Sequence, residues 1–184
     1  MLYGGRLERL VTRQARHLIK AHTSQSSGKA LFIDMGSNLG QGFKFFSRYY
    51  DPNIFDYWLV EPNPFCLDSL KKNVSEAYIA NGWTGEWQII NAAVFSADGT
   101  LSLYGLVEDH RGKTSDGASV IKDHGSARYK SDENQALKVR SIRASKFISD
   151  AADKYSTIVV KMDIESSEYD VLEDLIGTGL VNTI

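Results

Sequence analysis

The chain has 184 residues, of which 42% are hydrophobic and 24% are charged, and its net charge is −2. That length and composition suit one globular domain with a buried core, and the near-zero charge argues against a protein built to bind nucleic acid. A single cysteine, Cys66, excludes an internal disulfide, and no apolar run approaches the roughly 18 residues of a membrane span. We therefore expect a cytoplasmic protein with no membrane span.

The first 29 residues are basic, with six lysines and arginines against one acid, Glu8. Apolar residues at helical spacing over residues 6–21 predict an amphipathic helix that packs on the edge of the domain. Its apolar face comprises Leu7, Leu10, Val11, Leu18 and Ile19. Because residues 23–29 are a polar linker, we divide the chain into a basic helix with its linker (1–29) and a folded domain (30–184). The basic face can contact an anionic partner, although a solvated helix face explains it more simply.

Predicted strands and helices alternate through the rest of the chain. Continuous apolar runs, typical of strands buried on both faces, occur at 30–33, 57–60, 87–90 (continuing through 91–94) and 158–162. Helical periodicity occurs between Gly40 and Asp51-Pro52, and over 66–78, 144–153 and 169–176. This alternation predicts an α/β protein with a doubly wound, mostly parallel sheet.

The middle of the chain contains turn signals and one long polar segment. Asp98-Gly99 predicts the turn of a hairpin, and Leu137 and Val139 predict a further strand. Residues 105–136 show no periodicity, and a loop of that length predicts a lid or binding loop. His110 and His124 lie in it and could act as bases, although loop histidines are usually solvated.

Acidic residues stand at the ends of three predicted strands: Asp34, Glu61 and Asp163. In open α/β sheets, ligands bind beyond the carboxyl ends of the strands. The turn after Asp34 contains Gly36 and Gly40, where the backbone can approach a ligand closely, and it opens a helix whose N–H groups can bind an anion. Glu61 follows Gly40 by 21 positions, a spacing suited to a carboxylate that accepts both ribose hydroxyls.

These features favour S-adenosylmethionine as the ligand, because it offers a carboxylate to the loop, an ammonium to an acid and a ribose to Glu61. The competing ligand is a nicotinamide dinucleotide, whose G-x-G-x-x-G fingerprint would place Asp34 at the first glycine. A carboxylate there would repel a pyrophosphate. A nicotinamide-dependent oxidoreductase and a catalytically silent cofactor-fold module that binds a partner through the basic helix stay as alternatives.

Four segments together resemble the FkbM-type S-adenosylmethionine-dependent methyltransferases: residues 32–41, 60–64, 91–99 and 160–168. They occur in the family's order across residues 30–180, and where the family usually has Gly-Ala this chain has Ser166-Ser167. The resemblance implies a class I, Rossmann-like methyltransferase fold. It also implies that Glu61 binds the ribose, that Asn91 and Ala92 lie near the adenine, and that Asp163 lies beside the reacting centre. The implied contacts of the first motif are Asp34, Gly36, Ser37, Asn38 and Gly40.

Asp163, Glu165 and Glu168 are the candidate catalytic residues. Alternate residues of an extended segment share a face, so Asp163 and Glu165 can point into one cleft, and Glu168 returns from the first turn of the next helix. A carboxylate there can act as general base toward a hydroxyl, which predicts an O-methyltransferase. Glu165 and Glu168 are equally explained as acids at a helix N-terminus. A divalent metal held by these acids is an alternative to a general base, but no other feature of the sequence supports it. The resemblance implies that the acceptor is a small molecule with a hydroxyl group: a sugar, a glycolipid or a polyketide-like compound.

The resemblance places a further strand at residues 180–184, where the sequence ends. Only about four parallel strands are accounted for, so we expect a C-terminally shortened, incomplete sheet. An open edge of a buried type of strand exposes unpaired backbone groups. We therefore expect that edge to be covered, either by a second copy in a homodimer or by the helix of residues 6–21.

Overall fold

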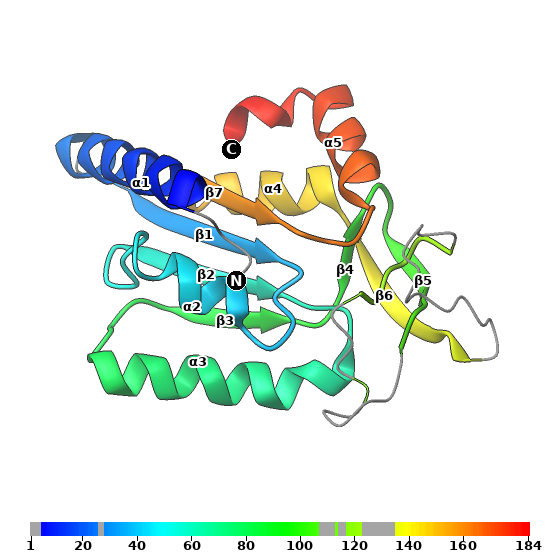
Figure 1. Cartoon of the computed structure of the whole chain (residues 1–184). Helices are drawn as coiled ribbons and strands as arrows, with labels where there is room; N and C mark the ends of the chain where they lie inside the picture. The colour runs from blue at the N-terminus through cyan, green and yellow to red at the C-terminus, as the bar shows by residue number, and fades with distance from the viewer. Residues whose placement is uncertain (1–4, 26–27, 107–112, 114–116, 123–134) are drawn as a thin grey trace.

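The computed structural model describes residues 5–25, 28–106, 113, 117–122 and 135–184 (Figure 1). The strands are β1 (Lys29–Met35), β2 (Phe55–Val60), β3 (Trp87–Ile90), β4 (Ala93–Phe95), β5 (Gly99–Leu103), β6 (Leu137–Arg143) and β7 (Tyr155–Met162). The helices are α1 (Gly5–Gln25), α2 (Gln41–Phe46), α3 (Leu67–Asn81), α4 (Ala144–Ala152) and α5 (Glu168–Gly177). Short 3₁₀ helices are η1 (Pro64–Cys66) and η3 (Leu180–Thr183).

Four strands form a parallel sheet in the order β3-β2-β1-β7, which confirms the α/β prediction. β1 is an inner strand, with Ile33 opposite Trp58 of β2 and Val160 of β7. Parallel pairing between strands far apart in sequence requires the crossover helices that the periodicity predicts. The carboxyl ends of all four strands consequently lie at one edge of the sheet (Figure 1).

Helices cover both faces of this sheet, and β1 is therefore buried on both sides. On one face Phe32 stacks against a cluster of aromatic rings, with ring centroids 5.0 Å from Tyr50 and 5.2 Å from Tyr57. This core also receives side chains from α1, α2 and α3. On the other face Leu31 and Ile33 pack with residues of α4 and α5. Each such buried apolar side chain contributes about 1.5–3 kcal/mol to folding.

A second, three-stranded sheet in the order β4-β6-β5 lies beyond the carboxyl ends of the first (Figure 1). It corrects two predictions. The strand expected over 87–94 divides at Asn91, because the carbonyl of Ile90 accepts hydrogen bonds from both Glu61 and Ala92, and β4 joins the second sheet. The predicted hairpin does not form, because β6 lies between β4 and β5. The Asp98 carboxylate accepts a bond from the Arg143 amide (2.9 Å), which fixes the turn to β6.

A buried acid joins this second sheet to the helices. Asp174 of α5 accepts bonds from Nε (2.8 Å) and Nη2 (2.7 Å) of Arg143 and from the Ser145 amide (2.7 Å) at the start of α4. Burial raises the pKa of Asp174, but the hydrogen bonds from Arg143 and Ser145 outweigh burial and hold it below its usual value. One carboxylate therefore fixes α4, α5 and the end of β6 together.

The N-terminal helix packs on a face of the sheet. Val11 and Ala15 are buried in the core that includes Val159 of β7. Leu10, predicted on the apolar face, is 63% exposed, because it lies about 100° around the helix from Val11. Among the described residues no strand pairs with the second edge of β7, and the segment expected to form a further strand is η3. Covering of that edge by a second copy stays a prediction.

Two predicted elements are altered in detail. Helix α2 ends at Phe46, earlier than the turn at Asp51-Pro52. The helix expected over 66–78 is preceded by the 3₁₀ turn η1, and Asn63 caps that turn by accepting a bond from the Phe65 amide (3.1 Å). Within the long loop, Ser119 forms an isolated antiparallel bridge with Tyr104. His110 and His124 lie outside the described residues. Of the helices placed by the structure, none has the length and apolar content of a membrane crossing.

Candidate functional site

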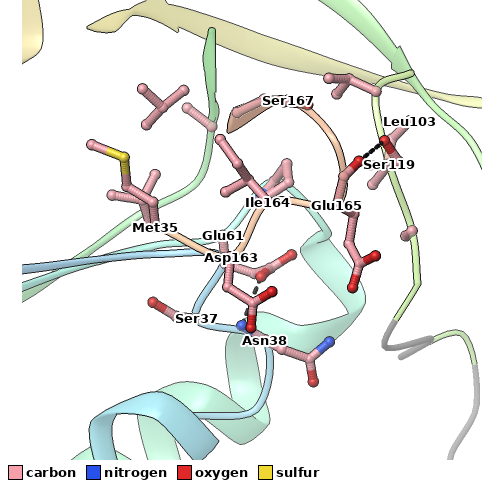
Figure 2. Close-up of a pocket in the computed structure, with 18 of the residues that line it drawn as sticks. Met35, Ser37, Asn38, Glu61, Leu103, Ser119, Asp163, Ile164, Glu165 and Ser167 are labelled. Carbon is pink, nitrogen blue, oxygen red and sulfur yellow. Dashed lines mark hydrogen bonds between the residues drawn. The ribbon is translucent and has the colours of Figure 1, made fainter. Parts of the chain in front are cut away.

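A cavity of about 350 Å³ opens at the carboxyl ends of β1, β2 and β7, beneath the second sheet (Figure 2). Its polar side is formed by the loop after β1 and by Glu61, Lys161, Asp163 and Glu165. Its apolar side includes Val94, Leu103, Ala118, Val120 and Ile164. The cavity can therefore hold a ligand with a charged, hydroxyl-bearing part and an apolar part.

The loop after β1 is held by hydrogen bonds to the end of β2 and to its own Asn38 side chain. The amides of Gly36 and Ser37 both donate to the carbonyl of Val60, at 3.0 and 3.1 Å, and the Leu39 amide donates to Oδ1 of Asn38 (2.8 Å). Gly36 adopts φ +78°, and a Cβ there would lie 2.0 Å from the carbonyl oxygen of Asp163. These three loop amides are therefore engaged within the protein. The N–H groups expected to bind an anion are those that open α2, where Gln41 and Gly42 line the cavity, and that expectation stays a prediction.

Glu61 connects the loops after β1 and β2. Its Oε2 accepts a bond from the Asn38 amide (2.7 Å) and its Oε1 from the Asn63 amide (2.8 Å). Each carboxylate oxygen can accept a second bond, so the group can still bind two hydroxyls. Burial raises the pKa of Glu61 to about 7, although the amides of Asn63 and Asn38 act in the opposite direction. Glu61 thus combines a buried position with unused acceptor capacity toward the cavity.

Asp34 lies beneath the cavity and is fully buried. Strand alternation turns it toward α2, where Gly42 leaves room for the carboxylate: a Cβ at Gly42 would lie 2.7 Å from Oδ2. The Lys161 ammonium is 3.0 Å from Oδ1 as an ion pair, at an angle outside hydrogen-bond geometry. Burial raises the pKa of Asp34, and Lys161 opposes that effect. Asp34 is thus outside the cavity lining, so the arrangement does not support the predicted contact between Asp34 and a ligand ammonium.

The turn after β7 carries the candidate catalytic acids. Asp163 and Glu165 both line the cavity, as predicted, but for another reason. Glu165 (φ +54°) and Ser166 (φ +76°) are left-handed, so the segment turns sharply instead of continuing extended. Glu168 lies outside the lining, and its Oε1 accepts a bond from the Ile164 amide (2.8 Å). A catalytic role for Glu168 is therefore unsupported, because its carboxylate closes the turn.

Ser119 anchors the described part of the long loop to this turn. Its Oγ donates to the carbonyl of Glu165 at 2.6 Å, as Figure 2 shows, and accepts a bond from the Ile121 amide at 2.9 Å. Ser119 is 1% exposed and its neighbours Ala118 and Val120 line the apolar side of the cavity. The loop thus supplies a wall of the site opposite the β1 loop.

The structure brings together most of the residues predicted from sequence. The lining includes seven of them: Gly36, Ser37, Asn38, Glu61, Ala92, Asp163 and Glu165. Two others act beside it. Gly40 (φ +94°) precedes α2 outside the lining, and Asn91 donates to the carbonyls of Glu61 (2.8 Å) and Pro62 (3.1 Å). Asn91 therefore supports the backbone near the cavity instead of lining it.

Two further residues at the cavity, Lys161 and Ser119, were not predicted from the sequence. Lys161 interrupts an otherwise apolar run immediately before Asp163, and a lysine in a buried strand is rare unless it is paired. The position of Lys161 in this run could therefore have indicated a functional role. Ser119 lies in a segment without periodicity, where no sequence pattern singles it out. Among the residues placed by the structure, no group of three or more His, Cys, Asp or Glu side chains is arranged to hold a metal ion.

The doubly wound parallel sheet, with its cavity beyond the carboxyl ends of β1 and β2, is consistent with a class I methyltransferase fold. The sequence profile of the methyltransferase FkbM domain matches residues 34–182. The chain therefore belongs to the FkbM methyltransferase family.

One solved structure that resembles the chain is the methyltransferase FkbM from Methylobacillus flagellatus KT. The TM-score is 0.47 and the sequence identity is 14%, and the match covers 84% of this chain and 32% of that chain. This chain thus spans about a third of that protein's length. No curated protein matches the chain.

Proposed function

We propose that this protein is an S-adenosylmethionine-dependent methyltransferase that transfers a methyl group to a hydroxyl oxygen. The observation that carries the proposal is the position of Glu61, Asp163 and Glu165, which come from separate loops and line one cavity. The family membership supports methyl transfer over the dinucleotide chemistry that sequence left as an alternative.

The residues present fit the methyl donor. Glu61 has one unused acceptor site on each oxygen, which suits the two ribose hydroxyls, and it lies against the loop of Gly36 and Asn38. The acidic lining favours a ligand that carries positive charge, and the apolar side suits an adenine ring or a thioether. Bound there, the donor would supply a methyl carbon already activated by a sulfonium.

Asp163 and Glu165 act on the acceptor in this proposal. With the donor bound, the acceptor oxygen would form a bond to the methyl carbon while the carbon–sulfur bond breaks, and that electron pair would stay on sulfur. The hydroxyl proton passes to a carboxylate, for which Asp163 is the first candidate because its side chain is 63% exposed and lines the cavity. The main task of the remaining residues is to align the reactants and exclude water.

The acceptor class proposed is a hydroxyl of a sugar, glycolipid or polyketide-like small molecule. In the cavity, the apolar wall near Leu103 and Val120 can pack against the carbon skeleton of such a molecule while the acids bind its hydroxyls. A homodimer through the edge of β7 that pairs with no described strand is part of the same proposal, and its test is molecular mass by light scattering.

Calorimetric titration with S-adenosylhomocysteine and, separately, with NAD⁺ tests the donor. We expect binding of S-adenosylhomocysteine and not of NAD⁺. Tighter binding of NAD⁺ would favour the oxidoreductase alternative, and binding of neither would favour a silent module. Transfer of radiolabelled methyl groups to a panel of hydroxyl and amine acceptors then tests O-methylation, which methylation of amines alone would exclude.

A further inference from the structure

Lys161 is a nearly buried cation at the carboxyl end of β7, with a side chain that is 10% exposed. Its Nζ donates to the carbonyl of Gly36 at 2.9 Å and to that of Met35 at 3.3 Å. The same atom is 3.0 Å from Oδ1 of Asp34 and 3.7 Å from Oδ2 of Asp163. One ammonium therefore contacts the end of β1, the loop after it and the acid that follows β7.

The ammonium donates hydrogen bonds to two backbone carbonyls, those of Met35 and Gly36, and it forms an ion pair with Oδ1 of Asp34 at 3.0 Å. Desolvation of an ammonium is costly unless the cation is paired, and Asp34 supplies the opposite charge. Lys161 is consequently committed to the protein, although it also borders the cavity. This arrangement indicates a support for the loop and not a cation that binds substrate.

The loop at Gly36 depends on that support. Gly36 is pressed against the backbone of Asp163, as the 2.0 Å approach of a built Cβ to the Asp163 carbonyl shows, and it is left-handed. Its neighbours Ser37 and Asn38 line the cavity. A shift of the Gly36 carbonyl would therefore move the donor side of the cavity relative to Asp163.

We propose that Lys161 is a positioning residue that fixes the Gly36 loop relative to Asp163, with Asp34 as the counter-ion that keeps Lys161 in place. This inference rests on the proposed function only where it concerns ligand affinity. It assigns Asp34 an indirect role: the carboxylate acts through Lys161 and touches no ligand.

The test compares three variants with the unaltered chain: Asp34→Asn, Lys161→Met, and the double variant D34N/K161M. K161M leaves Asp34 buried without its cation and should lower the melting temperature. The double variant removes both charges and should recover most of that loss. Lys146→Met is the matched control, because Lys146 lies on the exposed surface of α4 and pairs with Asp150. Should D34N/K161M not fold, D34N/K161Q replaces it, with a neutral side chain one atom shorter than lysine.

Two readouts separate positioning from stability. Even with its melting temperature recovered, D34N/K161M should bind S-adenosylhomocysteine roughly tenfold more weakly than the unaltered chain. Loss of a contact that supports a binding residue typically has an effect of this size. Amide hydrogen exchange at Gly36 and Ser37, whose amides donate to Val60, should be roughly tenfold faster without any ligand. K146M should change neither quantity.

The inference would be overturned if D34N/K161M were stable and its amide exchange at Gly36 and Ser37 were unchanged. It would also be overturned if D34N/K161M bound S-adenosylhomocysteine with the affinity of the unaltered chain. If the unaltered chain does not bind S-adenosylhomocysteine, the proposed function fails. The exchange measurement, which needs no ligand, still decides the positioning role of Lys161.

Discussion

Binding of the methyl donor should depend on the ionisation of Glu61. The ionised carboxylate can accept both ribose hydroxyls in addition to the Asn38 and Asn63 amides, whereas the protonated acid loses acceptor capacity. Burial raises the pKa of Glu61 to about 7, so the change occurs in an accessible pH range. A pH of about 5.5 lies about 1.5 units below that pKa. Ionising the carboxyl group for binding would then cost about 2 kcal/mol. S-adenosylhomocysteine should therefore bind roughly 30-fold more weakly there than at about pH 8.

Folding stability should change with pH in the opposite direction. The native protein holds the Glu61 proton more tightly than the unfolded chain, in which the group titrates near 4.5. The stabilising contribution of this raised pKa is therefore complete below about pH 4.5 and is lost as the pH rises through about 7. Weaker binding at low pH would then not result from unfolding through this group.

Calorimetry across this pH range on the unaltered chain, Glu61→Gln and the control Glu76→Gln provides the assay. Glutamine offers one acceptor oxygen, so its amide N–H₂ would face a backbone donor at Asn38 or Asn63, at a cost of about 1–3 kcal/mol. E61Q should bind weakly at every pH, while the exposed E76Q should keep the original profile. Affinity independent of pH in the unaltered chain, or an unchanged pH profile in E61Q, would refute the ribose assignment.

Three further predictions concern other acids and the strained turn. Asp163→Asn should abolish methyl transfer but leave the affinity for S-adenosylhomocysteine within about threefold, because Asp163 acts on the acceptor; turnover that survives would exclude it as the base. Ser166→Gly should raise the free energy of unfolding in urea by about 0.5–1 kcal/mol, because Ser166 has φ +76°, whereas Ser167→Gly, at φ −82°, should not stabilise. Asp174→Asn should lower it by about 2–3 kcal/mol, through bonds lost to Arg143 and Ser145. Because the pKa of Asp174 is lowered, its contribution should be present above about pH 4 and lost on acidification, so the deficit of D174N should shrink in acid.

Sequence by itself determined the parallel sheet and the place of the site. Strands buried on both faces require continuous apolar runs, and those runs at 30–33, 57–60 and 158–162 became β1, β2 and β7. Because parallel strands end at the same edge of a sheet, the acids Glu61 and Asp163 could be predicted to lie at one cavity.

Only the tertiary structure decided which groups touch. Asp34 and Lys161 are separated by 127 positions, and no local pattern indicates that their charges meet beneath the cavity. The same holds for β6, which lies between β4 and β5 although Asp98-Gly99 favours a local hairpin. Periodicity reports which face of a strand or helix is buried, since that depends on nearby residues. Ion pairs and strand neighbours depend on residues distant in sequence, and those contacts exist only once the chain has folded.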